Sequence, residues 1–384
     1  MIVESFLQSV KDRNEPGWMN SKRLNAFVKF SQTGMPNPKE EEWKYTDVSK
    51  IELNNPKFGI VDIAIKSSSD KVIALPMKEA IKKFSDIIQK HFLISDSDKF
   101  VSFVHSFWDN GIFVYVPQDV DGGTIYSSIG NSTTPTYSLV ILEKGSKLNL
   151  VEENTSNEDQ HFSSNVTEIS VKESAELNYF PYQNPSNDLC NLHYKRAILE
   201  RDGKINWFVG MFGSKLSRWK IETLLNGENA ECQKRGIIIG NHDQHHDMIT
   251  KTFHMVQHTK GNTEVKGVLT DNSFSVYRGL VRIEKNAQQS DAYMGSHNIL
   301  LGEKAKANSI PTLQIEANDV KATHGSSTGH VDEEKLFYLM TRGLDRNEAE
   351  NVIVEGFVGS ILNKITLEDV REKFKSIIIE KLRK

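Results

Sequence analysis

From about Gly111 onward, the chain alternates apolar and polar residues over short stretches, and a period of two is typical of strands with one buried face. These stretches are rich in β-branched residues and lie at residues 112–116, 138–142, 147–151, 166–171, 176–180, 205–209, 219–224 and 237–239. Short corners of small and polar residues recur between them, roughly 18 to 32 residues apart. The corners are residues 145–147, 174–176, 202–204, 229–231, 261–263, 286–288 and 304–306.

This pattern predicts a mainly β fold, a right-handed parallel β-helix. In such a solenoid each strand pairs with the equivalent strand of the next turn, and the inward apolar residues stack into one continuous core. No long helical pattern separates the strands, so alternating β–α units are not expected. A β-sandwich is the alternative, but it needs tight hairpins. Between these stretches an Asn-Gly pair occurs only at Asn226-Gly227.

Helical periodicity marks both ends of the chain. Residues 1–105 are predicted to form a mostly helical N-terminal domain, residues 106–330 the β-helix core, and residues 331–384 a C-terminal helical domain. Two N-terminal helices are expected to bury apolar side chains, namely Ile2, Phe6, Leu7 and Val10 in the first and Leu24, Phe27, Val28 and Phe30 in the second. A further amphipathic helix is predicted over residues 78–92.

The C-terminal helices have clear start and stop signals. The first is predicted from Asp332 to Thr341 and ends before Gly343, the second begins at the capping box that starts with Asp345, and the last begins near Thr366. These helices suit two roles: they can cap the open end of the core, or they can form a docking surface for a partner.

Composition excludes several classes of protein. The net charge of −4 gives no basic excess, so no nucleic acid partner is expected. The two cysteines, Cys190 and Cys232, have no C-x-x-C spacing and cannot fill the four-thiolate shell of an iron–sulfur cluster. The chain has no N-terminal apolar segment and no run of membrane-spanning length. A cytoplasmic protein with no membrane contact is therefore expected.

Motifs of the common enzyme classes are also absent from the sequence. It contains no phosphate-binding Gly-x-x-x-x-Gly-Lys-Ser/Thr loop, no dinucleotide-binding Gly-x-Gly-x-x-Gly after a strand, and no Gly-x-Ser-x-Gly nucleophile elbow. We therefore do not expect the chain itself to hydrolyse ATP or to bind a dinucleotide.

A group of histidines in the core region leaves two interpretations open. It comprises His242, His245, His246, His254 and His258. These side chains can decorate one polar face of the solenoid, or they can bind a divalent metal weakly, since neutral imidazole is a common ligand. The second interpretation makes the chain a cytosolic metal-dependent β-helix enzyme. No His-Glu-x-x-His motif supports a metalloprotease.

His324 stands beside Gly325 in a stretch expected to be a polar turn just before the first C-terminal helix. An imidazole exposed on a rigid turn can ligate a borderline metal, whereas a lone histidine more often only forms hydrogen bonds within its turn. Sequence pattern alone does not separate these two roles.

The segments around His324 resemble the signature of the SufB/SufD family, the scaffold proteins of the Suf iron–sulfur cluster assembly machinery. Asn318-Asp319-Val320 and Thr323-His324-Gly325 are similar to the SufD branch, which typically has Ser-His-Gly, whereas the SufB branch usually has His-Glu. Residues 41–46, Glu-Glu-Trp-Lys-Tyr-Thr, resemble the N-terminal hallmark of the family. Where SufB has a cysteine thought to receive sulfur, this chain has Ser296 or His297, and Ala322 replaces a cysteine that SufD-type proteins often carry.

The resemblance implies a non-catalytic, SufD-like subunit with two partners. It implies pairing with a SufB-like scaffold through the β-helix, or with a second copy as a homodimer, and binding of a SufC-like ATPase by the C-terminal helices. The resemblance implies no tightly bound cofactor, but a transient iron–sulfur cluster at the SufB interface, with His324 as a nitrogen ligand. The ATPase contacts are expected at Phe337, Leu339, Phe357 and Ile361.

Overall fold

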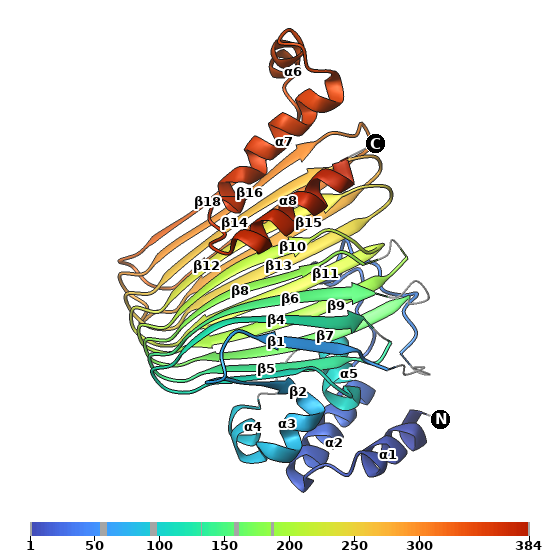
Figure 1. The fold of residues 1–384 in the computed structure, drawn as a ribbon, viewed down its shortest axis with the longest axis vertical. Helices are drawn as coiled ribbons and strands as arrows, with labels where there is room; N and C mark the ends of the chain where they lie inside the picture. Colours follow the sequence, from blue (N-terminus) through green and yellow to red (C-terminus); the bar gives the residue numbers. More distant parts are fainter. Residues whose placement is uncertain are drawn as a thin grey trace.

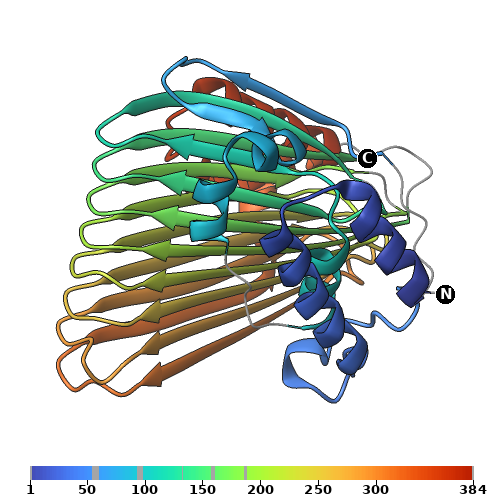
Figure 2. The same cartoon turned by 90° about the horizontal axis from the view of Figure 1, so that it is seen from below.

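Two long sheets form the body of the protein (Figure 1 and Figure 2). The computed structural model describes residues 2–53, 60–92, 98–131, 133–156, 161–185 and 188–382. Sheet A contains, in order, β1 (Ile63–Ser67), β4 (Asp121–Asn131), β6 (Lys147–Ser156), β8 (Glu176–Gln183), β10 (Lys204–Met211), β12 (Glu231–Gly240), β14 (Lys260–Leu269), β16 (Asp291–Leu300) and β18 (Lys321–His330). Sheet B contains β2 (Ile73–Pro76), β3 (Ile112–Val116), β5 (Thr136–Leu142), β7 (Phe162–Val171), β9 (Cys190–Leu199), β11 (Leu216–Leu225), β13 (His245–His254), β15 (Phe274–Ile283) and β17 (Lys306–Ile315).

From β3 onward, consecutive strands alternate between the two sheets, and each strand pairs in parallel with the strand two places further along the chain. This connectivity is that of a β-solenoid and confirms the predicted β-helix; the sandwich alternative is wrong. The predicted strands all lie within observed ones. Among the described strands only β1 and β2 pair antiparallel, with β4 and β3, so the region predicted to be mostly helical also contributes two strands to the solenoid.

The corners that lead into sheet A share one backbone geometry. A residue with positive φ stands two positions before each of the strands β4 to β16 of sheet A, as at Gly145 (68°), Ser174 (56°), Asp202 (55°) and Asn229 (60°). Small and short polar residues tolerate this left-handed conformation, which explains the corners that recur in the sequence.

One of the predicted corners is misplaced. Gly261 lies inside β14, and the turn that precedes this strand is at His258, with φ of 61°. A side chain at Gly261 would approach the ring of His254 to 2.8 Å, so this glycine makes room for packing and does not form the turn.

The inward side chains of both sheets form one apolar core along the solenoid axis, which we call the lumen core. Trp207 of β10 and Trp219 of β11 are fully buried there. The corresponding positions of the last strands, β17 and β18, remain mostly exposed because no further turn covers them.

Helices cover the two outer faces. The N-terminal helices α1 (Ile2–Arg13), α2 (Gly17–Gln32), α3 (Met77–Lys83), α4 (Ser85–His91) and α5 (Lys99–Phe107) lie at one end of the solenoid, and apolar residues of this region pack on sheet B (Figure 2). The predicted helix over residues 78–92 is interrupted at Phe84, where the backbone leaves helical geometry. Phe6, Phe27 and Phe30 are buried as predicted, but Leu7, Leu24 and Val28 are exposed.

The C-terminal helices are α6 (Glu333–Met340), α7 (Arg346–Leu362) and α8 (Glu368–Leu382), and the last two pack on the outer face of sheet A. The Asp345–Glu348 capping box is present, and Asp332 caps α6. Figure 1 shows that α6 projects beyond the last strands of the solenoid. None of the helices in the described segments is long and apolar enough to cross a bilayer.

Candidate functional site

One end of the solenoid is formed by β17 and β18. Each of these strands is the last in its sheet, so one edge of each has no neighbouring strand within the described part of the chain. An exposed strand edge presents unpaired N–H and C=O groups and is a template for pairing with another chain. We refer to the exposed edges and inner faces of β17 and β18 as the open end.

His324 lies in the middle of β18 and not in a turn, so the predicted turn is wrong. Its register partner is Met294, whose side chain belongs to the lumen core, and Ala322 packs against the same core. Residues directly opposite on neighbouring strands point to the same face. The His324 side chain therefore faces the lumen side of the last turn, and it is exposed because no further turn covers it.

Polar groups surround this part of the lumen. The hydroxyls of Ser296 and Ser309 lie 3.0 Å apart, and the amide of Asn298 donates to Thr328 Oγ1 at 3.1 Å. Ser296 is buried and hydrogen-bonded. His330 lies on the same face of β18, at its far end.

The residues predicted to bind an ATPase separate into two groups. Phe337 is 69% exposed on α6, next to the exposed Tyr338 and the half-buried Leu339. Ile361, by contrast, is buried between α7 and sheet A, and Lys266 of β14 stacks on the ring of Phe357 at 4.6 Å. The prediction that Ile361 faces a partner is therefore wrong, and Phe357 also serves to hold α7 on the solenoid.

The histidines of the core region are dispersed over one strand and its two flanking turns. His242 and His258 lie in turns at opposite ends of β13, roughly 33 Å apart for a ten-residue strand. His246 and His254 are fully buried, and burial lowers their pKa to about 3 and about 4. His245 stacks with Phe274. In the described segments no three His, Cys, Asp or Glu side chains converge to hold a metal ion.

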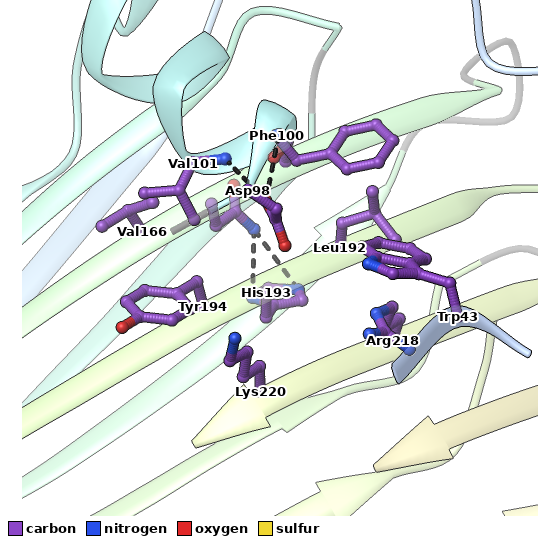
Figure 3. Close-up of a pocket in the computed structure, with 12 residues that line it drawn as sticks. Trp43, Asp98, Phe100, Val101, Val166, Leu192, His193, Tyr194, Arg218 and Lys220 are labelled. Atoms are coloured by element: carbon purple, nitrogen blue, oxygen red, sulfur yellow. Dashed lines mark hydrogen bonds between the residues drawn. The ribbon is translucent and has the colours of Figure 1, made fainter. Parts of the chain in front are cut away.

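A small cavity lies between α5 and sheet B (Figure 3). Asp98 lies at the N-terminus of α5, where its carboxylate accepts hydrogen bonds from the N–H groups of Phe100 and Val101. Lys220 and Arg218 approach from the sheet below (Figure 3). The cavity measures about 30 Å³, room for about one water molecule, so it is too small for a substrate.

The hallmark segment of residues 41–46, which we call the N-terminal strap, crosses the outer face of sheet B. Trp43 is buried and stacks on the Arg218 guanidinium at 3.7 Å, and Thr46 donates to Asp247, which also binds Arg218 and Arg278. The strap therefore forms a packed aromatic corner, and it holds three strands of sheet B together.

Glu42 of the strap is held by two lysines of the sheet. Burial raises the pKa of the Glu42 carboxyl, but the ammonium groups of Lys220 and Lys251 outweigh burial and lower this pKa to about 2. The carboxylate is therefore charged throughout the physiological range.

A buried ion pair inside the solenoid was not predicted from the sequence. Glu152 of β6 and Lys195 of β9 face each other across the lumen at 2.7 Å, and both are at least 97% buried. Tyr179 donates to Glu152 at 2.5 Å and accepts from Lys195 at 2.9 Å. The sequence shows only that each strand has a charged residue at one position. That this position faces the lumen becomes clear once the structure shows which alternate residues of the strand point inward.

Comparisons with known proteins agree with this geometry. Residues 125–357 match the SufBD core domain of the SUF system for iron–sulfur cluster assembly, and residues 6–67 match the SufBD N-terminal region. The iron–sulfur cluster assembly protein SufD of Bacillus subtilis is 26% identical, over 100% of this chain and 98% of its own length. SufB of the same organism is 28% identical over 78% of this chain and 67% of its own length. A SufBD family protein of Synechocystis is 28% identical over 82% of this chain and 69% of its own length.

The core match extends from β4 through most of α7, and the N-terminal match includes the strap. Together they span well over half of the chain, including the solenoid that ends in the open end. The chain therefore belongs to the SufBD family of the SUF iron–sulfur cluster assembly system.

Proposed function

We propose that the chain is a SufD-like subunit of a scaffold on which iron–sulfur clusters are assembled in the cytoplasm. The full-length similarity to a SufD protein and the Thr323-His324-Gly325 sequence support this assignment. The residues Ser296 and His297 support it too, because neither side chain supplies a thiol for sulfur transfer. The single observation that carries the proposal is the open end, where an unpaired strand presents His324.

A SufB-like chain pairs with the open end by strand addition. The unpaired backbone groups of β17 and β18 supply hydrogen bonds, and the uncovered lumen face supplies apolar contact. Ile315, 42% exposed at the end of β17, and the partly buried Ala322 are apolar surface that such a partner covers.

His324 lies at the junction between the two subunits in this arrangement. Its imidazole then offers one nitrogen ligand to a cluster forming at the interface, and the partner supplies thiolate ligands, which iron–sulfur clusters require. The subunit itself is not catalytic: it positions a ligand, while sulfur transfer and ATP hydrolysis belong to the partners.

A SufC-like ATPase docks on α6. This helix extends past the solenoid and exposes Phe337, Tyr338 and Met340, three large apolar side chains on a helix of eight residues. Large aromatic side chains of this kind are typical anchors of protein interfaces.

The ligand role of His324 is tested in a complex reconstituted with SufB-like and SufC-like chains. We expect His324→Ala to reduce the cluster yield, measured by visible absorbance after anaerobic loading, without loss of the complex on size exclusion. His330→Ala is the matched control, because His330 occupies the same face at the far end of β18. A normal cluster yield with His324→Ala would reject this role.

The α6 contact has its own test. Phe337→Ala is expected to weaken ATPase binding by about 2 kcal/mol, the typical cost of truncating an aromatic anchor, measured by calorimetry. Val352→Ala, on the exposed side of α7, is the control. Equal affinities for both variants would place the ATPase elsewhere.

A further inference from the structure

Charges alternate in sign from strand to strand along the side of sheet A where its strands begin. The first residues of its eight solenoid strands lie in register and form a single column, which we call the charge ladder. Its members, from β4 to β18, are Asp121, Lys147, Glu176, Lys204, Glu231, Lys260, Asp291 and Lys321. A groove beside the middle of the ladder keeps these side chains in contact with water.

Each inner member of the ladder has an opposite charge on both sides, one strand spacing (about 4.8 Å) away. Opposite charges directly across two strands stabilise their pairing, and like charges oppose it. Lys321 is the exception at the open end: Asp291 lies on one side, and the other side has no strand. A strand that pairs with β18 would therefore place a residue beside Lys321.

Each of the two open-end strands begins with a lysine, and neither strand contains a carboxylate. β17 carries Lys306, and β18 carries Lys321, His324 and His330, with no Asp or Glu in either ten-residue strand. An incoming strand with carboxylates thus meets complementary charge along this edge. An incoming strand of the same composition does not.

A second copy of this chain fits the edge poorly. Two copies of the chain could pair through antiparallel β18 strands related by a two-fold axis. Each lumen-facing residue of one copy must then lie opposite a lumen-facing residue of the other copy. With the overlap centred on Ser326, Lys321 lies opposite Val331 of the second copy, which carries no charge.

The carboxylates that follow β18 are already engaged. Asp332 accepts hydrogen bonds from the N–H groups at the start of α6, and Glu333 pairs with Arg346 at 2.7 Å. In a self-pair, neither is free to neutralise Lys321.

From these observations, and resting on the proposed pairing through the open end, we infer that this end selects a different chain over a second copy. The selected chain places a carboxylate of its edge strand beside Lys321 and so continues the charge ladder across the interface. The ladder fixes the register of the pair as well as the choice of partner, because a shift of the incoming strand removes the carboxylate from Lys321.

The test compares two affinities: that of the full chain for the purified SufB-type chain of the same organism, by calorimetry, and that of the chain for itself, by sedimentation equilibrium. We expect the heteromeric pair to be at least tenfold tighter. Lys321→Gln should weaken it about threefold and Lys321→Glu about tenfold, and the Lys321 effect should shrink in 0.5 M salt. Lys304→Glu is the matched control, because Lys304 is exposed in the turn before β17 and lies outside the ladder.

The outcomes are distinguishable. If wild type binds the SufB-type chain and Lys321→Glu binds equally well, the charge-ladder inference is overturned and pairing through the open end stands. Self-association tighter than the heteromeric pair also overturns the inference. If wild type does not bind the SufB-type chain, the proposed function and the inference both fail.

Discussion

The buried Glu152–Lys195 pair gives the sharpest test of the energetics of the solenoid. Lys195→Met removes one charge and leaves the Glu152 carboxylate inside the lumen with Tyr179 and Asn154 as its hydrogen-bond donors. Methionine fills a similar volume, so the perturbation is mainly electrostatic.

The expected loss is large because the pair has almost no contact with water. Both side chains are at most 3% exposed, and removal of one partner of a buried pair typically costs about 3–5 kcal/mol. Glu152→Gln in the Lys195→Met background removes the second charge and keeps a hydrogen-bonding group for Tyr179. The double variant should therefore recover most of the loss and lie within about 1–2 kcal/mol of wild type.

The pH dependence supplies an independent readout. In wild type, burial raises the pKa of Glu152, but Lys195 and the hydrogen bonds outweigh burial and lower it. The stability from this carboxylate is thus present above its unfolded pKa, near 4.3, and is lost as pH falls through the lower folded pKa. Without Lys195, burial dominates and the folded pKa rises. The deficit of Lys195→Met should therefore shrink as pH falls from 7 towards 5.

Urea unfolding followed by tryptophan fluorescence measures these changes near the site, because the Lys195 ammonium lies 5.5 Å from the ring of Trp219. Solenoids unfold in segments, so the midpoint of the transition reported by the lumen tryptophans is the relevant quantity. The reasoning is refuted if Lys195→Met is as stable as wild type at pH 7, or if the second substitution recovers nothing.

Three further predictions concern the strap and the glycines. Trp43→Ala should cost about 3–5 kcal/mol and should make residues 33–53 sensitive to limited proteolysis, and unchanged cleavage would contradict the clamp. Glu42 has a folded pKa of about 2, so its contribution is lost as pH falls from about 4.5 to 2; Glu42→Gln should flatten acid unfolding over that range. At Gly227 a Cβ would lie 1.9 Å from a backbone nitrogen, so Gly227→Ala should destabilise the protein by at least about 1–3 kcal/mol. Gly356 lies within α7 with open space around it, so Gly356→Ala should stabilise the protein by up to about 1 kcal/mol. Melting temperatures of the two variants equal to that of wild type would contradict both predictions.

Much of the candidate site was predictable because the open end consists of recognisable local signals. The asparagine–aspartate–valine stretch, His324 and the capped helix after it are adjacent in sequence, and their resemblance to one family required no coordinates. The assignment of His324 to a turn was wrong because β18 is rich in Gly, Ser and Thr, which have weak strand preference by themselves. Register pairing with β16 makes this segment a strand.

The sequence by itself determined eight of the strands, most of the corners between them and the helix caps, because period-two alternation, left-handed corner residues and capping side chains act over a few neighbouring residues. Only the tertiary structure decided which side chains meet across turns of the solenoid. Glu152 and Lys195 are 43 positions apart, and members of the charge ladder are separated by nearly 30. Such contacts depend on register, and one-residue shifts in register reverse the face on which every side chain lies.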